Sequence, residues 1–151
     1  MAVTYKRTNN VLIALTEQEH KALSAAGWDN LEKFKQGKGN HTAWFNIATR
    51  MRFALELSTL FYEEVTAVAI KLAYDTCVGV YTRATSTKPA VWTMSEFEID
   101  HIEQVLEVLE TMQRSLLRKD MAAAMRKVVT HMRSKYVKDH HLQPLPPKRL
   151  R

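Results

Sequence analysis

Lysine and arginine side chains in the C-terminal third are the clearest candidates for chemistry in this sequence. Lys119, Arg126 and Arg133 are spaced by seven residues, so a helix would place them on one face. Lys127 lies beside that face, and the further cations are Lys135, Lys138, Lys148, Arg149 and Arg151. Contacts to nucleic acid phosphates require such a clustered basic face. A solvated helix face, or a surface that binds an acidic host protein, has the same pattern.

The net charge changes sign just before these basic residues. Residues 91–112 contain six acidic residues and no basic one, whereas residues 113–151 contain eleven basic residues and two acidic ones. Two antiparallel copies would place each acidic segment beside a basic one and cover Val105, Val108 and Leu117. The charge pattern therefore predicts a homodimer.

Metal-ligand spacings occur but lack the context that a metal site needs. Glu-x-x-His is found at residues 17–20 and 98–101, and in four-helix carboxylate proteins this spacing contributes to a two-metal site. Residues 98–101 fall at a predicted helix start, and residues 17–20 lie on a helix too short for a bundle core. We expect no metal and no other cofactor.

No catalytic constellation accompanies the basic residues. Cys77 stands among apolar and aromatic neighbours and is predicted to be a small core residue. Gly37-Lys38-Gly39 lacks the preceding strand that a phosphate-binding glycine loop needs. We therefore expect a binding protein and not an enzyme.

Composition and periodicity predict an all-α protein that positions these residues. The 151 residues include only four glycines and four prolines, which favours long helices over a turn-rich β fold. Across residues 42–81, apolar or small residues recur at steps of three and four, which predicts a long central helix. This stripe consists of Trp44, Ile47, Met51, Ala54, Ser58, Phe61, Val65, Val68 and Leu72.

A second long helix is predicted over residues 95–132, with a kink or short break near residues 117–120. Short connections make sequential helices antiparallel neighbours, so the predicted fold is a helical bundle built on a long antiparallel helix hairpin. The predicted buried residues of this second helix are Ile99, Ile102, Leu106, Leu109, Met112 (or Gln113), Leu116 and, beyond the break, Met121, Met125, Val128, Met132 and Tyr136.

Two short N-terminal helices are expected to close the bundle. Thr16 and Glu19 have the spacing of a capping box, which predicts a helix over residues 17–26 that ends at Gly27. A second helix is predicted over residues 29–34, and the apolar run at residues 11–15 is predicted to be a strand or an extended segment. We expect one helical domain over residues 1–139 and a flexible basic tail over residues 140–151.

The compartment follows from what the sequence lacks. It contains no signal peptide, no apolar run long enough to span a bilayer, and a single cysteine. We expect a cytoplasmic protein with no membrane partner.

The N-terminal segment also matches the opening of a ribbon–helix–helix DNA-binding domain. Lys6-Arg7, an apolar run and a capped helix occur in the required order. The long insertion at residues 27–40 and the large C-terminal half do not fit that small fold.

Several positions over about residues 15–117 share their spacing with one group of proteins. The chain resembles small helical proteins carried by prophages and plasmids of Gram-negative bacteria, some of them labelled Fis-type regulators. The resemblance implies an accessory protein of a mobile genetic element and supplies no catalytic residues. The positions that carry it are Leu15-Thr-Glu-Gln-Glu-His20, Ala22-Leu23, Gly37-x-Gly39-Asn40 and Trp92.

Overall fold

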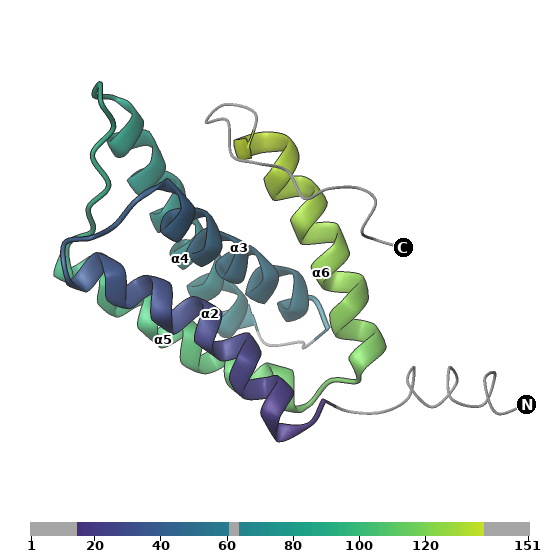
Figure 1. The fold of residues 1–151 in the computed structure, drawn as a ribbon. Coiled ribbons are helices and arrows are strands. Elements are labelled where there is room, and N and C mark those ends of the chain that lie inside the picture. The colour runs from purple at the N-terminus through teal and green to yellow at the C-terminus, as the bar shows by residue number, and fades with distance from the viewer. Residues whose placement is uncertain (1–14, 61–63, 138–151) are drawn as a thin grey trace, which may run out of the picture.

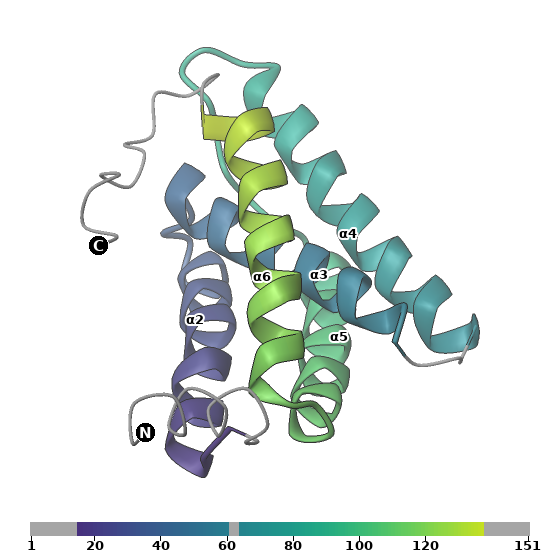
Figure 2. The same ribbon diagram turned by 90° about the vertical axis from the view of Figure 1, so that its right-hand side faces the viewer.

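The computed structural model describes residues 15–60 and 64–137, and all regular structure in these residues is helical. The all-α fold predicted from the sequence is therefore confirmed. Figures 1 and 2 show how the helices are arranged. They are α2 (Glu17–Lys35), α3 (His41–Ser58), α4 (Glu64–Thr85), α5 (Glu96–Arg114), α6 (Arg118–Met132) and a short π-helix, η1 (Arg133–Val137).

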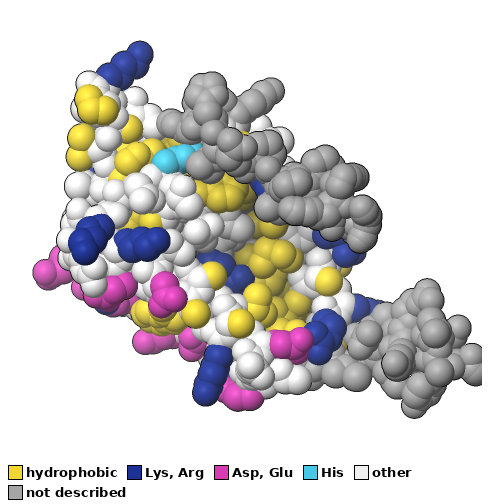
Figure 3. All heavy atoms as spheres, viewed as in Figure 1, with side chains coloured by type: hydrophobic (Ala, Val, Ile, Leu, Met, Phe, Trp, Pro, Cys, Tyr) yellow, Lys and Arg dark blue, Asp and Glu magenta, His cyan; other side chains and the backbone are white. Residues whose placement is uncertain are grey.

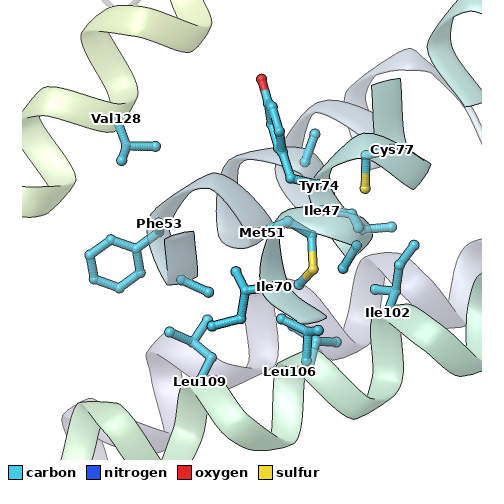
Figure 4. Close-up of a cluster of buried hydrophobic side chains, with 14 of the residues drawn as sticks. Ile47, Met51, Phe53, Ile70, Tyr74, Cys77, Ile102, Leu106, Leu109 and Val128 are labelled. Carbon is cyan, nitrogen blue, oxygen red and sulfur yellow. The ribbon is translucent and has the colours of Figure 1, made fainter. Parts of the chain in front are cut away.

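Helix α3 forms the centre of the bundle and packs against α2, α4, α5 and α6. It starts at Asn40, whose side chain accepts a hydrogen bond from the backbone N–H of Ala43 at 2.8 Å. Ile47 and Met51 of α3 are fully buried and lie among side chains from α4 and α5 (Figure 4). The first half of the predicted central stripe, from Trp44 to Ser58, is buried as expected.

The prediction of one continuous helix over residues 42–81 is wrong, because α3 ends at Ser58 and α4 packs back against it. The hydroxyls of Ser58 and Thr59 donate to backbone carbonyls three residues earlier, which satisfies acceptors at the helix end. Helix α4 then buries a different set of residues, so Val68 and Leu72 of the predicted stripe are 59% and 52% exposed. Phe61, which continued that stripe, lies outside the described residues.

The second predicted long helix is likewise divided, into α5 and α6. Ser95 starts α5 with a capping box that includes Glu98, and the chain leaves the helix after Arg114. Helix α6 begins at Arg118 and crosses over α3 (Figure 2). The predicted buried residues of both helices are confirmed, except that Met125 is only partly buried. In the described residues, the bundle thus consists of α3 with four other α-helices packed around it, and not of one long hairpin.

The N-terminal region also differs from the prediction, because residues 17–35 form one helix instead of two. The expected capping box of Thr16 and Glu19 is present at its start. Gly27, predicted to end a helix, lies inside α2 where that helix packs against α5. A Cβ atom at Gly27 would lie 2.7 Å from the Cδ2 atom of Leu106, so the missing side chain permits a close approach. The chain turns instead near Gly37, which has a φ of +74°.

Replacing Gly27 by alanine is therefore expected to lower the free energy of unfolding by about 1 kcal/mol. Overpacking against Leu106 outweighs the gain in helix propensity. Gly79→Ala is the matched control, because Gly79 lies within α4 and nothing stands within 4 Å of its added Cβ. That variant is expected to gain about 0.5–1 kcal/mol. Urea denaturation of both variants measures the difference, and an equal gain at both glycines would show that Gly27 is not a packing position.

Candidate nucleic-acid interface

The orientation of α6 decides which of its charged residues face solvent. Met121, Val128 and Met132 are buried against the core, together with Ala124. Lys119 and Arg126, which are two turns apart, are exposed. They are separated by about 10 Å along the helix axis. The structure therefore places two of the predicted basic residues on the solvent face of α6.

Lys119 and Arg126 differ from Arg118, at the start of α6, in their ion pairing. Arg118 binds both carboxylate oxygens of Glu19, at 2.6 and 2.8 Å, which ties α6 to α2. Among the described residues, Lys119 and Arg126 have no carboxylate within ion-pair distance. No carboxylate of the described residues therefore neutralises either charge.

Lys127 is the weakest candidate among the predicted residues of α6. Its Nζ atom lies 3.0 Å from Oε2 of Glu56, so the pair joins α6 to α3. The ammonium side chain is 72% exposed, and a pair this exposed contributes little to stability. Lys127 therefore has a partner within the chain that an external phosphate must replace.

The remaining predicted cations lie at and beyond the end of α6. The side chain of Arg133 is half-buried, whereas Lys135 is exposed and its ammonium lies 5.6 Å from the ring centroid of Tyr136. The ring of Tyr136 is held edge-on against Trp44 and Tyr81, with centroid distances of 5.0 and 4.9 Å. This aromatic contact fixes η1 against α3 and α4. Lys138, Lys148, Arg149 and Arg151 lie outside the described residues.

Arg52 and His131 join this basic region, although the sequence analysis did not select them. Arg52 lies on α3, with its guanidinium carbon 5.4 Å from the ring centroid of Tyr74. Burial lowers the pKa of His131, and the nearby charges of Arg52 and Lys135 lower it further. Arg52 is far from α6 in the chain, so only the packing of α3 against α6 brings the three residues together. The available signal was an arginine off the apolar stripe of a mostly apolar helix, which also carries Arg50.

The other candidates for chemistry have structural partners. Glu17 accepts hydrogen bonds from both terminal nitrogens of Arg114, and Glu98 accepts them from both terminal nitrogens of Arg83. Within residues 15–60 and 64–137, no group of three or more His, Cys, Asp or Glu residues could hold a metal ion. Cys77 is fully buried, and burial raises the pKa of its thiol.

The contact between Glu19 and Arg118 predicts a loss of stability in acid. Hydrogen bonds from Arg118, and then from the Thr16 backbone, lower the pKa of Glu19 from 4.5 to about 2. Because this pKa is lower in the folded state, the stabilisation is present above about pH 4.5 and is lost as the pH falls towards 2.

Urea denaturation between pH 6 and pH 3 measures this dependence. Glu19→Gln is expected to lose less stability over that range than the parent protein does. Glu107→Gln serves as the control, because Glu107 is exposed and makes no ion pair with a described residue. If the parent and Glu19→Gln respond to acid equally, the contact does not stabilise the fold.

The fold and the site thus define an all-α protein with a basic surface on α6, η1 and the adjoining part of α3. Comparisons with protein-family models, curated proteins and solved structures gave no match. None of the helices in the described part of the chain combines the length and the hydropathy of a membrane span.

Proposed function

We propose that this protein is a cytoplasmic, non-enzymatic nucleic-acid-binding protein of a mobile genetic element. It contacts phosphates through the basic face of α6 and η1, extended by the C-terminal residues 138–151. The observation that carries this proposal is that Lys119 and Arg126 stand exposed without a carboxylate partner in the described chain, while Arg118 beside them is paired. Cations held on one face repel each other, and a polyanion relieves that repulsion.

Arg52, His131 and Lys135 supply a second group of contacts at the other end of α6. Burial, and then the nearby charges of Arg52 and Lys135, lower the pKa of His131 and favour its neutral imidazole in the free protein. A bound phosphate favours the imidazolium, so binding takes up a proton and the affinity rises as the pH falls. His131→Gln is expected to flatten this pH dependence.

Fluorescence anisotropy with labelled duplex DNA and with RNA tests the proposal at about 50 and 200 mM salt. We expect binding that weakens steeply with salt. The double variant Lys119→Gln/Arg126→Gln should lower the affinity and reduce the slope of log K against log salt by about 2. No binding at low salt would contradict the proposal.

The matched control is Lys33→Gln/Lys38→Gln. Both lysines are exposed, on α2 and in the turn that follows it, and the double variant changes the net charge equally. We expect it to retain the affinity and most of the salt slope. Equal losses in the two double variants would indicate a general effect of net charge and not a site on α6.

A second candidate function is binding of a host protein, as an interaction or inhibitor module. Val68 and Leu72 favour it, because they lie one turn apart on α4 and expose large apolar side chains. Capture of a host partner from lysate tests this alternative. A partner that is lost with Leu72→Lys but retained with Lys119→Gln would support it over nucleic acid binding.

We also propose that the protein is a homodimer, although some residues of the predicted dimer contact are already engaged within one protomer. Val105 is buried inside the protomer, and Glu98 and Glu103 already contact Arg83 and Lys35. Val68 and Leu72 on α4 are exposed and offer apolar surface for a dimer contact in place of Val105. Light scattering at micromolar concentration should give about twice the 17.4 kDa of one chain. A monomer mass that does not change with concentration would refute the dimer.

A further inference from the structure

Arg50 is a buried cation that has no counter-charge in the described part of the chain. Figure 3 shows Lys and Arg side chains that project from the surface into solvent, where water and dissolved ions surround them. Arg50 differs from these, because it is only 4% exposed. None of the carboxylates in residues 15–60 and 64–137 lies within ion-pair distance of its guanidinium. A charge taken out of water is costly unless an opposite charge accompanies it.

Three helices enclose the Arg50 side chain. Its Cγ atom lies 3.5 Å from the position that a Cβ atom at Gly27 of α2 would occupy, so α2 covers its aliphatic part. The guanidinium carbon lies 4.9 Å from the ring centroid of Phe53 on α3, and Nη2 donates to Oε1 of Gln113 on α5. Burial lowers the pKa of Arg50 to about 10, so the guanidinium keeps its charge at neutral pH.

Gln113 provides one acceptor to a group that can donate two parallel hydrogen bonds. A carboxylate fills such a pair of donors with its two oxygens, whereas the amide of Gln113 has one oxygen and one NH2 group. Nε of Arg50 and Nε2 of Gln113 are both buried, and neither has a hydrogen-bond partner among the described residues. Nε belongs to the same guanidinium as Nη2, and Nε2 to the same amide as Oε1. The two unpartnered donors therefore lie beside the Arg50–Gln113 hydrogen bond.

These two donors define the class of ligand that the site takes. Both atoms donate and the guanidinium is positive, so the ligand must accept hydrogen bonds and carry a negative charge. A water molecule would add donors of its own, although Oε1 of Gln113 already accepts a bond from Arg50. A phosphate group carries up to about two negative charges and at least three acceptor oxygens, which exceeds one cation and two N–H groups. A single halide ion matches both the charge and the donors.

We propose that Arg50 and Gln113 form a buried binding site for a monatomic anion of the class of chloride, between α3 and α5. The anion accepts hydrogen bonds from Nε of Arg50 and Nε2 of Gln113, and it neutralises the guanidinium. Folding alone brings these donors together, so the anion binds the folded chain and stabilises it. The site uses no residue of α6 or η1, and it is independent of the proposed nucleic-acid contacts.

Thermal melting of the full chain in chloride tests this site, with gluconate added to hold the ionic strength constant. For a site half-filled at about 10 mM, raising chloride from about 1 to about 100 mM increases the folding equilibrium constant about tenfold. We expect this change to raise the Tm of the parent protein by about 4 °C. A parent Tm that is equal at both chloride concentrations would overturn the proposal.

Gln113→Glu replaces the amide NH2 group by a second oxygen and supplies the counter-charge from within the chain. We expect its Tm to be independent of chloride and no lower than that of the parent at the higher chloride concentration. Arg52→Gln is the matched control, because it lies on α3 and makes the same change of net charge. This control should keep the parent's response. If Gln113→Glu responds as the parent does, or if Arg52→Gln alone loses the response, chloride binds elsewhere and the assignment is wrong.

Arg50→Met/Gln113→Leu keeps the test decisive if a carboxylate at residue 113 prevents folding. This variant removes both donors and the charge together, so we expect a folded protein whose Tm does not respond to chloride. The chloride-35 NMR line should also be broadened less by this variant than by the parent. A response equal to the parent's in both measurements would contradict the site. Neither measurement involves nucleic acid, so the inference can fail while the proposed function holds.

Discussion

Replacement of Ile47 by aspartate is expected to unfold the protein. Ile47 is fully buried on α3, among side chains of α4 and α5 (Figure 4). A carboxylate buried among these apolar side chains costs several kcal/mol in addition to the lost packing. That cost is comparable to the total stability of a typical domain, about 5–15 kcal/mol. Circular dichroism with thermal and urea denaturation measures the loss.

Thr42→Asp introduces the same residue on the same helix as a control. Thr42 is exposed in the first turn of α3, where the helix dipole favours a negative charge. We expect this variant to keep the parent's stability or gain slightly. If Ile47→Asp melts at the same temperature as the parent, α3 is not the centre of the core.

The second large effect is expected at a buried arginine. Arg50 is 4% exposed on α3, and burial lowers its pKa to about 10. Its Nη2 atom donates to the side-chain oxygen of Gln113, and its guanidinium carbon lies 4.9 Å from the ring centroid of Phe53. No described carboxylate pairs with it. Gln113→Leu removes the hydrogen bond that this buried cation makes to the Gln113 side chain and should cost about 3 kcal/mol.

A double variant separates this electrostatic cost from the effect of the leucine itself. Arg50→Met/Gln113→Leu replaces both polar partners with apolar side chains of similar length, and we expect a stability within about 1 kcal/mol of the parent. Urea denaturation of the parent, the two single variants and the double variant completes the cycle. If the double variant is as unstable as Gln113→Leu, the buried cation is not the cause.

Parts of the fold could be predicted because local sequence determines them. The capping box at Thr16 needs only Glu19 three residues later, and the buried face of α6 follows from apolar residues spaced at helical intervals. Lys119 and Arg126 could be placed on the solvent face for the same reason, since they lie opposite those apolar residues.

Helix lengths were less predictable, because periodicity continues through a break when both helices happen to be apolar. Residues 42–81 keep a helical spacing of apolar residues, yet the chain folds back between α3 and α4. The exposure of Val68 and Leu72 follows from the new face that α4 buries, which no local pattern specifies. At Gly27 the sequence predicted a helix end where the helix continues. The glycine instead lets α2 approach Leu106 of α5 closely.

The sequence by itself determined the all-α class, the caps and the amphipathic face of α6, since each depends on residues within a few turns of one another. Only the tertiary structure decided which charges remain available. Arg118 is paired because α2 brings Glu19 to it, and Lys127 because α3 brings Glu56. Arg52 joins His131 through the crossing of α3 and α6. Charge neutralisation depends on distances between helices that are remote in the chain, and packing alone sets those distances.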